Sequence, residues 1–125
     1  MVQGIGIDIV KIERIAEILD RSGKLYLKKL FTPREISHCS RAESQATYFA
    51  GLFAAKESIL KALGIGWNGV RGTDIEVRQD LLGAPLVSLK GELAKLAKSR
   101  TVSSVFVSIS YDGNYAIAVS ILEDE

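Results

Sequence analysis

Cysteine is scarce in this chain of 125 residues, and long apolar runs are missing from it. Its one cysteine, Cys39, cannot form a disulfide within the chain, so we expect a reducing compartment. A lone cysteine could also be a nucleophile, but the polar neighbours Ser37, His38 and Ser40 favour a structural position at a helix end. No apolar run is long enough to span a bilayer, and the N-terminus has neither the basic region nor the cleavage site of a signal peptide. We therefore expect a cytoplasmic protein.

Excess charge of either sign is also lacking, because the formal net charge is only +1. This excludes the overall positive field that is typical of nucleic-acid-binding proteins, so a charged partner would have to meet a local patch. Hydrophobic residues make up 47% of the chain and charged residues 25%, which argues against extensive disorder. The length predicts one domain over residues 1–125 with a modest core, which leaves room for oligomerisation.

Apolar periodicity and turn residues predict an α+β domain, in which a mostly antiparallel sheet packs against one long helix and several shorter helices. The expected strands are residues 2–9, 74–79, 86–89, 104–110 and 115–122. The expected helices are residues 11–21, 24–31, 33–39, 44–63 and 90–98. A hairpin turn is predicted at residues 111–114, between the last two strands.

Local signals define some of these boundaries. Thr32, with a proline directly after it and Glu35 three residues later, is typical of a helix start. Gly64 stands in the usual position of a left-handed helix cap. Gly4 and Gly6 fall on one face of the first strand, where glycines indicate that another element packs closely against the backbone.

The long helix at 44–63 carries charged residues within and beside its apolar face. On a helical wheel the apolar arc consists of Phe49, Leu52, Phe53, Leu60 and Leu63, with Ile59 at its edge. Lys56 falls in the middle of this arc, Glu57 lies on its border, and Lys61 follows Glu57 by one turn. A lysine within an apolar arc has to reach water by snorkelling or to meet an anion.

Two interpretations of these charged residues remain open. Lys56 could snorkel, while Glu57 and Lys61 form an ordinary salt bridge along the helix. Alternatively, the carboxylate could hold a metal while the two amines neutralise the oxygens of a phosphate-bearing ligand.

Asp8 is the candidate for a second metal ligand, because it closes a glycine-bearing strand at the edge of the sheet. Mg²⁺ typically takes one or two protein carboxylates and completes its shell with waters and substrate phosphates. Asp8 and Glu57 are therefore predicted to meet and to hold one divalent ion, Mg²⁺, with Mn²⁺ as the alternative. Asp8 could equally be the N-cap of the helix expected at 11–21.

Several short segments combine glycines, charged residues and serines. They are Gly4-Ile5-Gly6-Ile7-Asp8-Ile9-Val10, Phe53-Ala54-Ala55-Lys56-Glu57-Ser58, Lys61-Ala62-Leu63-Gly64, Gly83-Ala84-Pro85 and Ser108-Ile109-Ser110. Together they resemble the motifs of the holo-acyl-carrier-protein synthases, the small bacterial type of 4′-phosphopantetheinyl transferase. The combination of the first two segments at this separation is specific, and the likeness runs from end to end. The resemblance implies the 4′-phosphopantetheinyl transferase fold.

The resemblance also implies a reaction, in which the 4′-phosphopantetheine arm of coenzyme A moves to a serine of apo-acyl-carrier protein. Adenosine 3′,5′-bisphosphate leaves, and the holo-carrier supports fatty acid biosynthesis. Asp8 and Glu57 resemble the Mg²⁺ ligands, and Lys61 resembles a lysine that stabilises or protonates the departing phosphate, so Glu57 and Lys61 would be catalytic. The residues implied for coenzyme A binding are Lys56, Lys61, Gly83, Pro85 and Ser110. Either a water on the metal or Glu57 could accept the serine proton.

Three positions depart from the family pattern. Leu52 stands where many members have an arginine, so that cation is missing or is supplied elsewhere, for example by Arg41. Ala84 stands where the turn often has lysine, and Tyr111 stands where histidine often follows Ser110. A catalytic role is therefore not assigned to the side chain of Tyr111, although its backbone could line the adenine pocket.

Basic side chains exceed acidic ones over residues 11–29, although the whole chain is nearly neutral. Such a run is usually a solvated helix face, but the resembled family docks its acidic carrier protein on this first helical region. We therefore predict that Arg14, Arg21 and Lys24 contact the carrier and steer the encounter electrostatically. The resemblance also implies a homotrimer with active sites at subunit interfaces.

Two other functions compete with this one. A non-enzymatic module could use the basic helix to bind an acidic protein, and it would need no metal. A different nucleotide-binding enzyme has less support. A Walker-type loop is absent, and the stretch 64–69 has the spacing G-x-G-x-x-G but follows the helix predicted at 44–63 instead of a strand, so we interpret it as too irregular for a phosphate cradle. We expect neither nucleic acid nor a membrane as a partner.

Overall fold

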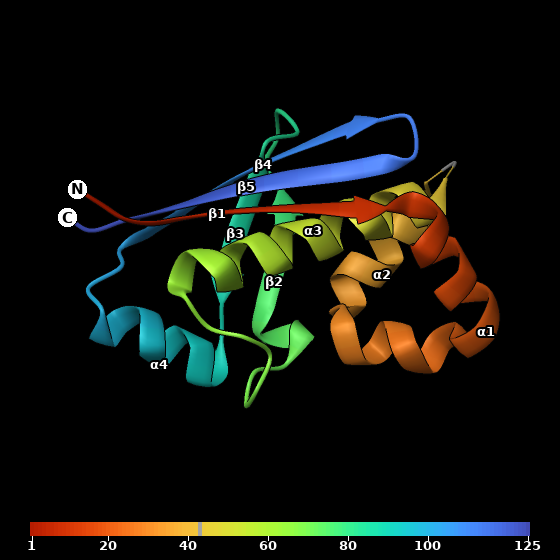
Figure 1. Ribbon diagram of the computed structural model, residues 1–125. Helices are drawn as coiled ribbons and strands as arrows, with labels where there is room; N and C mark the ends of the chain where they lie inside the picture. The colour runs from red at the N-terminus through yellow and green to blue at the C-terminus, as the bar shows by residue number, and fades with distance from the viewer. Residues whose placement is uncertain (43) are drawn as a thin grey trace.

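Helix α3 (Gln45–Leu63) runs through the middle of the molecule, between a sheet on one side and shorter elements on the other (Figure 1). The computed structural model describes residues 1–42 and 44–125, without the side chains of Ser22 and Lys24. The strands are β1 (Val2–Lys11), β2 (Ile75–Gln79), β3 (Pro85–Leu89), β4 (Ser104–Asp112) and β5 (Tyr115–Glu123). The other helices are α1 (Ile12–Leu30), α2 (Pro33–Ser40), the 3-10 turn η1 (Gly72–Asp74) and α4 (Gly91–Ser99).

The strands pair in an antiparallel manner, and they form separate sheets. The larger sheet has the order β1-β5-β4, and β2 pairs with β3 alone. Residues Gly113-Asn114 connect β4 to β5, because Asp112 is paired with Tyr115. The expectation of an α+β domain with antiparallel pairing is thus confirmed, with two sheets where one was predicted. None of the helices in the described ranges has the length and hydropathy needed to cross a bilayer.

The predicted helix boundaries are confirmed by the backbone geometry. Thr32 accepts a hydrogen bond from the backbone of Glu35, and the Glu35 carboxylate accepts one from the backbone of Thr32, which is a complete capping box. Gly64 ends α3 in the left-handed conformation, with φ of 73°. The break expected near Gly23 is a kink inside α1, where φ is 56°.

Helix α3 is buried on more faces than its apolar arc predicts. The apolar arc faces α1, α2 and β2. Small residues on the opposite side of α3 allow β1 and β5 to approach the helix. These small buried residues of α3 are Ala50, Gly51, Ala54, Ala55 and Ser58. A single-face wheel misses this second contact, because small side chains do not register as a strong apolar stripe.

Strand β1 lies directly on α3 at two glycines. A Cβ added to Gly6 would overlap the carbonyl oxygen of Ser58 and would lie 2.7 Å from the backbone nitrogen of Ala62. A Cβ on Gly4 would overlap the carbonyl oxygen of Ala62 in the same way. The predicted close packing at Gly4 and Gly6 is confirmed, and it sets the position of the next inward-facing residue, Asp8.

Replacing Gly6 by alanine should separate β1 from α3. We expect Gly6→Ala to lower the free energy of unfolding by about 1–3 kcal/mol, since the added methyl group meets backbone and not a side chain that can move. Gly66→Ala is the matched control, because nothing lies within 4 Å of its Cβ position. Urea denaturation followed by circular dichroism measures both, and equal stability of the two variants would contradict this packing.

Candidate functional site

Asp8 lies on the face of β1 that packs against α3. Its Oδ1 accepts a hydrogen bond from Lys61 Nζ at 3.0 Å, and the same amine donates to the carbonyl oxygen of Ile7 at 3.1 Å. The N-cap residue of α1 is Lys11, so the alternative interpretation of Asp8 as the cap of that helix is wrong. Packing of β1 on α3 therefore joins Asp8 to Lys61 across a separation of 53 residues.

Glu57 lies one turn before Lys61 on the same side of α3. Its Oε1 accepts a hydrogen bond from Trp67 Nε1 at 2.8 Å, and its side chain is half-buried. Lys61 pairs with Asp8, and the salt bridge along the helix between Glu57 and Lys61 is not found among the described residues. Burial and then the charge of Glu57 raise the pKa of the Tyr26 hydroxyl on α1, which indicates that this hydroxyl lies near Glu57.

Lys61 thus links the two predicted metal ligands, because it pairs with Asp8 of β1 and follows Glu57 by one turn of α3. Hard carboxylate oxygens are the protein ligands that Mg²⁺ prefers, and one or two of them suffice. Asp8 Oδ2 and Glu57 Oε2 take part in no hydrogen bond within the described part of the chain. In the same ranges no group of three or more His, Cys, Asp or Glu side chains could hold an ion. The donor chemistry fits a divalent cation, and metal binding by this pair stays a prediction.

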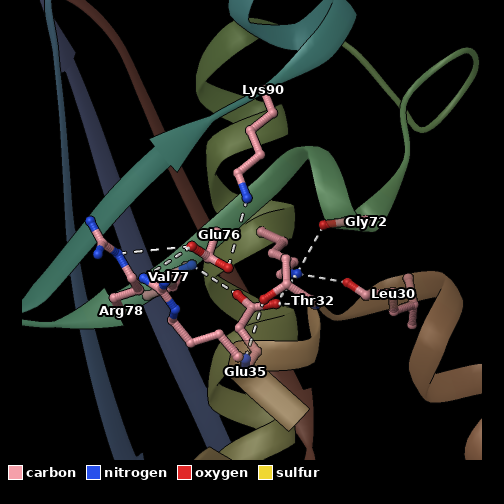
Figure 2. A network of polar contacts seen from close by, with 10 residues as sticks. Leu30, Thr32, Glu35, Gly72, Glu76, Val77, Arg78 and Lys90 are labelled. Atoms are coloured by element: carbon pink, nitrogen blue, oxygen red, sulfur yellow. Dashed lines mark hydrogen bonds and ion pairs between the residues drawn. The ribbon is translucent and has the colours of Figure 1, made fainter. Parts of the chain in front are cut away.

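Lys56 is completely buried, so the snorkelling interpretation is wrong. Its Nζ donates to the carbonyl oxygens of Leu30 at 2.6 Å and Gly72 at 2.9 Å, and to Glu35 Oε1 at 2.7 Å. Figure 2 shows these acceptors converging from three segments of the chain. An ammonium group has three N–H donors, and all are used here. Lys56 therefore has no N–H left for coenzyme A, and the structure does not support the expected direct contact with this ligand.

Glu35 is the anion that Lys56 meets, and it is as buried as its partner. Its Oε1 accepts from Lys56 and from the backbone of Thr32, while Oε2 accepts from the backbone nitrogen of Val77 at 2.8 Å. This pair connects α2, α3 and β2. Burial lowers the pKa of Lys56, and the attraction of Glu35 opposes that shift. The pair satisfies the requirement that a buried charge be matched and fully hydrogen-bonded.

A second group of charges lies beside this buried pair (Figure 2). Its centre is the buried Glu76, and its cations are more exposed. The Glu76 carboxylate lies 3.8 Å from Lys90 Nζ and from Arg78 Nε, and 4.0 Å from the guanidinium of Arg34. Burial raises the pKa of Glu76, but the hydrogen bond of Thr32 and these cations outweigh it, so the pKa is lowered. Glu76 therefore remains charged and holds the β2–β3 hairpin to α2.

A cavity of about 450 Å³ lies on another part of the molecule. It is enclosed by α2, α3, the β2–β3 hairpin and β4, and it contains none of Asp8, Glu57 and Lys61. Its lining includes Arg34, Arg78, Tyr48, Pro85 and Tyr111. Cations and aromatic rings together suit an aromatic ligand that carries negative charge.

The residues predicted to bind coenzyme A are therefore divided within one chain. Pro85 lines the cavity, and Gly83 occupies the turn before it with φ of 88°. Ser110 is exposed between the cavity residues Ile109 and Tyr111, so it belongs to the opposite face of β4. Lys61, by contrast, lies with Asp8 at the β1–α3 junction.

Two of the three departures from the family pattern, Leu52 and Tyr111, line the cavity. Arg34 and Arg78, not Arg41, are the arginines in its lining. Tyr111 fills the space above Gly51, where a Cβ would overlap its hydroxyl oxygen. Burial is the main cause that raises the pKa of the Tyr111 hydroxyl.

The predicted carrier surface is exposed where the structure describes it. Arg14 and Arg21 are exposed on α1, and the side chain of Lys24 lies outside the described part.

Cys39 is a buried free thiol. Its pKa is raised to about 12 by burial first and then by Glu35, which agrees with a structural role and not with a nucleophile.

Sequence reasoning missed Glu35 and Trp67 as parts of this region. Glu35 was identified only as a capping residue, since nothing in the sequence pairs it with Lys56. Trp67 carried one available signal, because it is the only tryptophan of the chain and stands ten residues after Glu57.

Comparison with known proteins gives one family over nearly the whole chain. The family model of the 4′-phosphopantetheinyl transferase superfamily matches residues 4–120. The holo-[acyl-carrier-protein] synthase of Syntrophus aciditrophicus is 44% identical over 124 residues, which are 98% of this chain and 97% of the relative. The enzyme of the same name from Clostridium tetani is 43% identical over 125 residues, which are 100% of this chain and 98% of the relative.

Solved structures agree with the sequence relatives. The crystal structure of holo-[acyl-carrier-protein] synthase from Neisseria meningitidis has a TM-score of 0.91 and 32% identity, and covers 99% of this chain and 100% of its own. That of the Helicobacter pylori enzyme in complex with coenzyme A has a TM-score of 0.84 and 33% identity, and covers 95% and 99%.

Proposed function

Because this chain belongs to the 4′-phosphopantetheinyl transferase superfamily, we propose that it is a holo-[acyl-carrier-protein] synthase. It transfers the 4′-phosphopantetheine group of coenzyme A to a serine of apo-acyl-carrier protein. The products are holo-acyl-carrier protein, for fatty acid biosynthesis, and adenosine 3′,5′-bisphosphate. The structure of the relative from Helicobacter pylori, which is in complex with coenzyme A, supports coenzyme A as the donor of the group.

The observation that carries this proposal is the grouping of Asp8, Glu57 and Lys61 at the β1–α3 junction. Lys61 Nζ lies 3.0 Å from Asp8 Oδ1, and Lys61 follows Glu57 by one helical turn, which supports a shared site for one cation and two carboxylates. Transfer of a phosphoryl-linked group depends mainly on positioning and on neutralising charge at the phosphates. The side chain of Lys61 is 53% exposed, so its amine can also reach a ligand at the surface.

Asp8 and Glu57 would hold the divalent ion, for which we propose Mg²⁺. When bound, the ion would supply positive charge beside the pyrophosphate of coenzyme A. Lys61 would stabilise the phosphate oxygen from which adenosine 3′,5′-bisphosphate departs. Glu57, which is half-buried and partly exposed, is the protein carboxylate available to accept the proton of the incoming serine hydroxyl.

We infer that the active protein is a homotrimer, with each site completed at a subunit interface. The outward face of the larger sheet supports an assembly, because large apolar side chains are exposed on it: Ile5 at 67%, Ile7 at 62%, Ile9 at 58% and Phe106 at 53%. The separation of the Asp8 group from the cavity at Pro85 agrees with a site built from two chains.

The basic face of α1 would receive the acidic carrier protein in the cytoplasm. We expect Arg14→Glu with Arg21→Glu to lower kcat/KM for apo-carrier about 10-fold at low salt, because steering of the encounter is lost, and to lose that effect at high salt. Lys95→Glu with Lys98→Glu on α4 makes the same change of charge and serves as control. Unchanged kcat/KM in the α1 variant at low salt would contradict this docking surface.

The activity is tested by mass spectrometry of the carrier. Apo-acyl-carrier protein, coenzyme A, Mg²⁺ and this protein are mixed, and the carrier should gain the mass of one phosphopantetheine. A carrier whose serine is replaced by alanine should gain none. An apo-carrier that stays unmodified would refute the proposed reaction and would leave the non-enzymatic acidic-protein binder as the better description.

A further inference from the structure

Trp67 contacts Glu57 through both its polar and its apolar parts. Its Nε1 donates to Glu57 Oε1 at 2.8 Å, and its ring stacks on Phe53 with a centroid separation of 6.4 Å and an interplanar angle of 18°. Phe53 lies one turn before Glu57 on α3. The stacking therefore fixes the indole along the helix, and the hydrogen bond fixes the direction of the carboxylate.

The loop that carries Trp67 is anchored to α3 at both ends. At its start, the backbone of Ile65 donates to the carbonyl oxygen of Leu60 at 3.0 Å, and Gly64 is the left-handed cap. At its end, the carbonyl oxygen of Gly72 accepts from Lys56 Nζ at 2.9 Å. Within the loop, the backbone of Val70 donates to the carbonyl oxygen of Trp67 at 3.0 Å.

The anchor at Gly72 depends on the absence of a side chain. A Cβ there would lie 2.5 Å from the Cα and from the carbonyl oxygen of Leu30. Without it, the carbonyl groups of Leu30 and Gly72 both reach the Lys56 amine, as Figure 2 shows. The adjacent residues Lys56 and Glu57 thus hold the loop at Gly72 and at Trp67.

These contacts assign a role to Trp67. We propose that Trp67 is a positioning residue that orients the Glu57 carboxylate for the divalent ion, while the buried Lys56–Glu35 pair keeps its loop in place. The inference rests on the proposed function, since it takes Glu57 as a metal ligand. The indole N–H engages Oε1, and Oε2 makes no hydrogen bond within the described residues, so it stays available to the ion. Hydrogen bonds of this kind orient the ligands of metal sites, and their loss typically weakens metal binding about 10–100-fold.

The test is the affinity for Mn²⁺, measured by electron paramagnetic resonance of the free ion with coenzyme A present. Trp67→Phe keeps an aromatic ring against Phe53 but removes the N–H donor. We expect its Mn²⁺ affinity to fall at least about 10-fold, with the melting temperature unchanged. Tyr115→Phe on β5 removes a polar atom from an aromatic residue elsewhere and should bind Mn²⁺ like the unmodified protein. Unchanged Mn²⁺ affinity in Trp67→Phe would overturn the inference.

A second measurement needs no substitution at Trp67. Because Trp67 is the only tryptophan, its fluorescence reports on this site alone. Addition of Mg²⁺ with coenzyme A should shift the emission of the unmodified protein, and Glu57→Gln should abolish the shift. A constant emission during Mg²⁺-dependent transfer would overturn the inference and leave the proposed function intact. Absence of both Mn²⁺ binding and transfer in the unmodified protein would instead refute the proposed function.

Discussion

Glu57→Gln is expected to lower the rate of phosphopantetheine transfer by about 10²–10³-fold, because weaker binding of the divalent ion would remove one source of electrostatic stabilisation from the transition state. Glutamine has nearly the shape of glutamate, and its amide oxygen can still accept from Trp67 Nε1. It lacks the negative charge that would bind the divalent ion beside Asp8. The fold should therefore persist while the chemistry is lost. Initial rates from mass spectrometry of the carrier, with circular dichroism for folding, measure the two effects separately.

Glu92→Gln is the matched control for this substitution. Glu92 is exposed on α4 and pairs only with Lys95 among the described residues, at 3.2 Å. The same chemical change should leave transfer within about twofold, since exposed pairs contribute little. Transfer by Glu57→Gln at the unmodified rate would show that this carboxylate is not needed. A Glu57→Gln protein that unfolds would show instead that Glu57 is structural.

Lys56→Met is expected to lower the free energy of unfolding by about 3–5 kcal/mol, because Glu35 would remain buried without its cation. The carbonyl groups of Leu30 and Gly72 would lose their donor as well. Methionine retains most of the volume and the apolar stem, so the loss reports charge and hydrogen bonding and not a cavity. Urea denaturation followed by circular dichroism gives the value.

A double-mutant cycle with Glu35→Gln separates the pair from its surroundings. Glutamine keeps an oxygen that can accept from the backbone of Thr32 or Val77, and it removes the negative charge. The double variant should therefore be more stable than the sum of the two single losses predicts. Additive losses would mean that Lys56 and Glu35 do not stabilise each other, and they would contradict the ion pair seen at 2.7 Å.

Local and motif-based features of this protein were predictable from its sequence. The capping box at Thr32 and the left-handed cap at Gly64 depend on residues within a few positions of each other, and both are present. The glycines of β1 predicted a close contact, and Gly6 has one with α3. The pairing of Asp8 with Glu57 as metal ligands stays a prediction, and its premise that Asp8 closes the strand is wrong, because β1 continues to Lys11.

Contacts fixed by tertiary packing were not predictable in the same way. Lys56 was placed correctly on the apolar face of α3, but its partner comes from 21 residues earlier in the chain. The choice between water, a ligand and an internal anion depends on which segment covers that face. Trp67 likewise reaches Glu57 only because its loop folds back over α3, a path that glycine-rich sequence leaves undetermined.

Division of the coenzyme A residues into two regions was also beyond the sequence. Pro85 and Lys61 belong to one resemblance, yet one lines the cavity and the other lies at the β1–α3 junction. A motif names residues without saying which chain of an assembly brings them to a ligand. The glycines of β1 predicted a packed face, but the pattern does not say what covers the exposed side chains of Ile5, Ile7 and Ile9 on the opposite face.

Restoration of activity by added metal shows whether the transfer reaction needs a divalent ion held by Asp8 and Glu57. The protein is stripped with EDTA, the chelator is removed, and transfer of phosphopantetheine to apo-carrier is measured as Mg²⁺ is added back. We expect no transfer by the stripped protein, full recovery with Mg²⁺, and a rate about 10²–10³-fold lower in Glu57→Gln at the same Mg²⁺ concentration. Transfer by the unmodified protein at its full rate in excess EDTA would contradict the role of a divalent ion at Asp8 and Glu57.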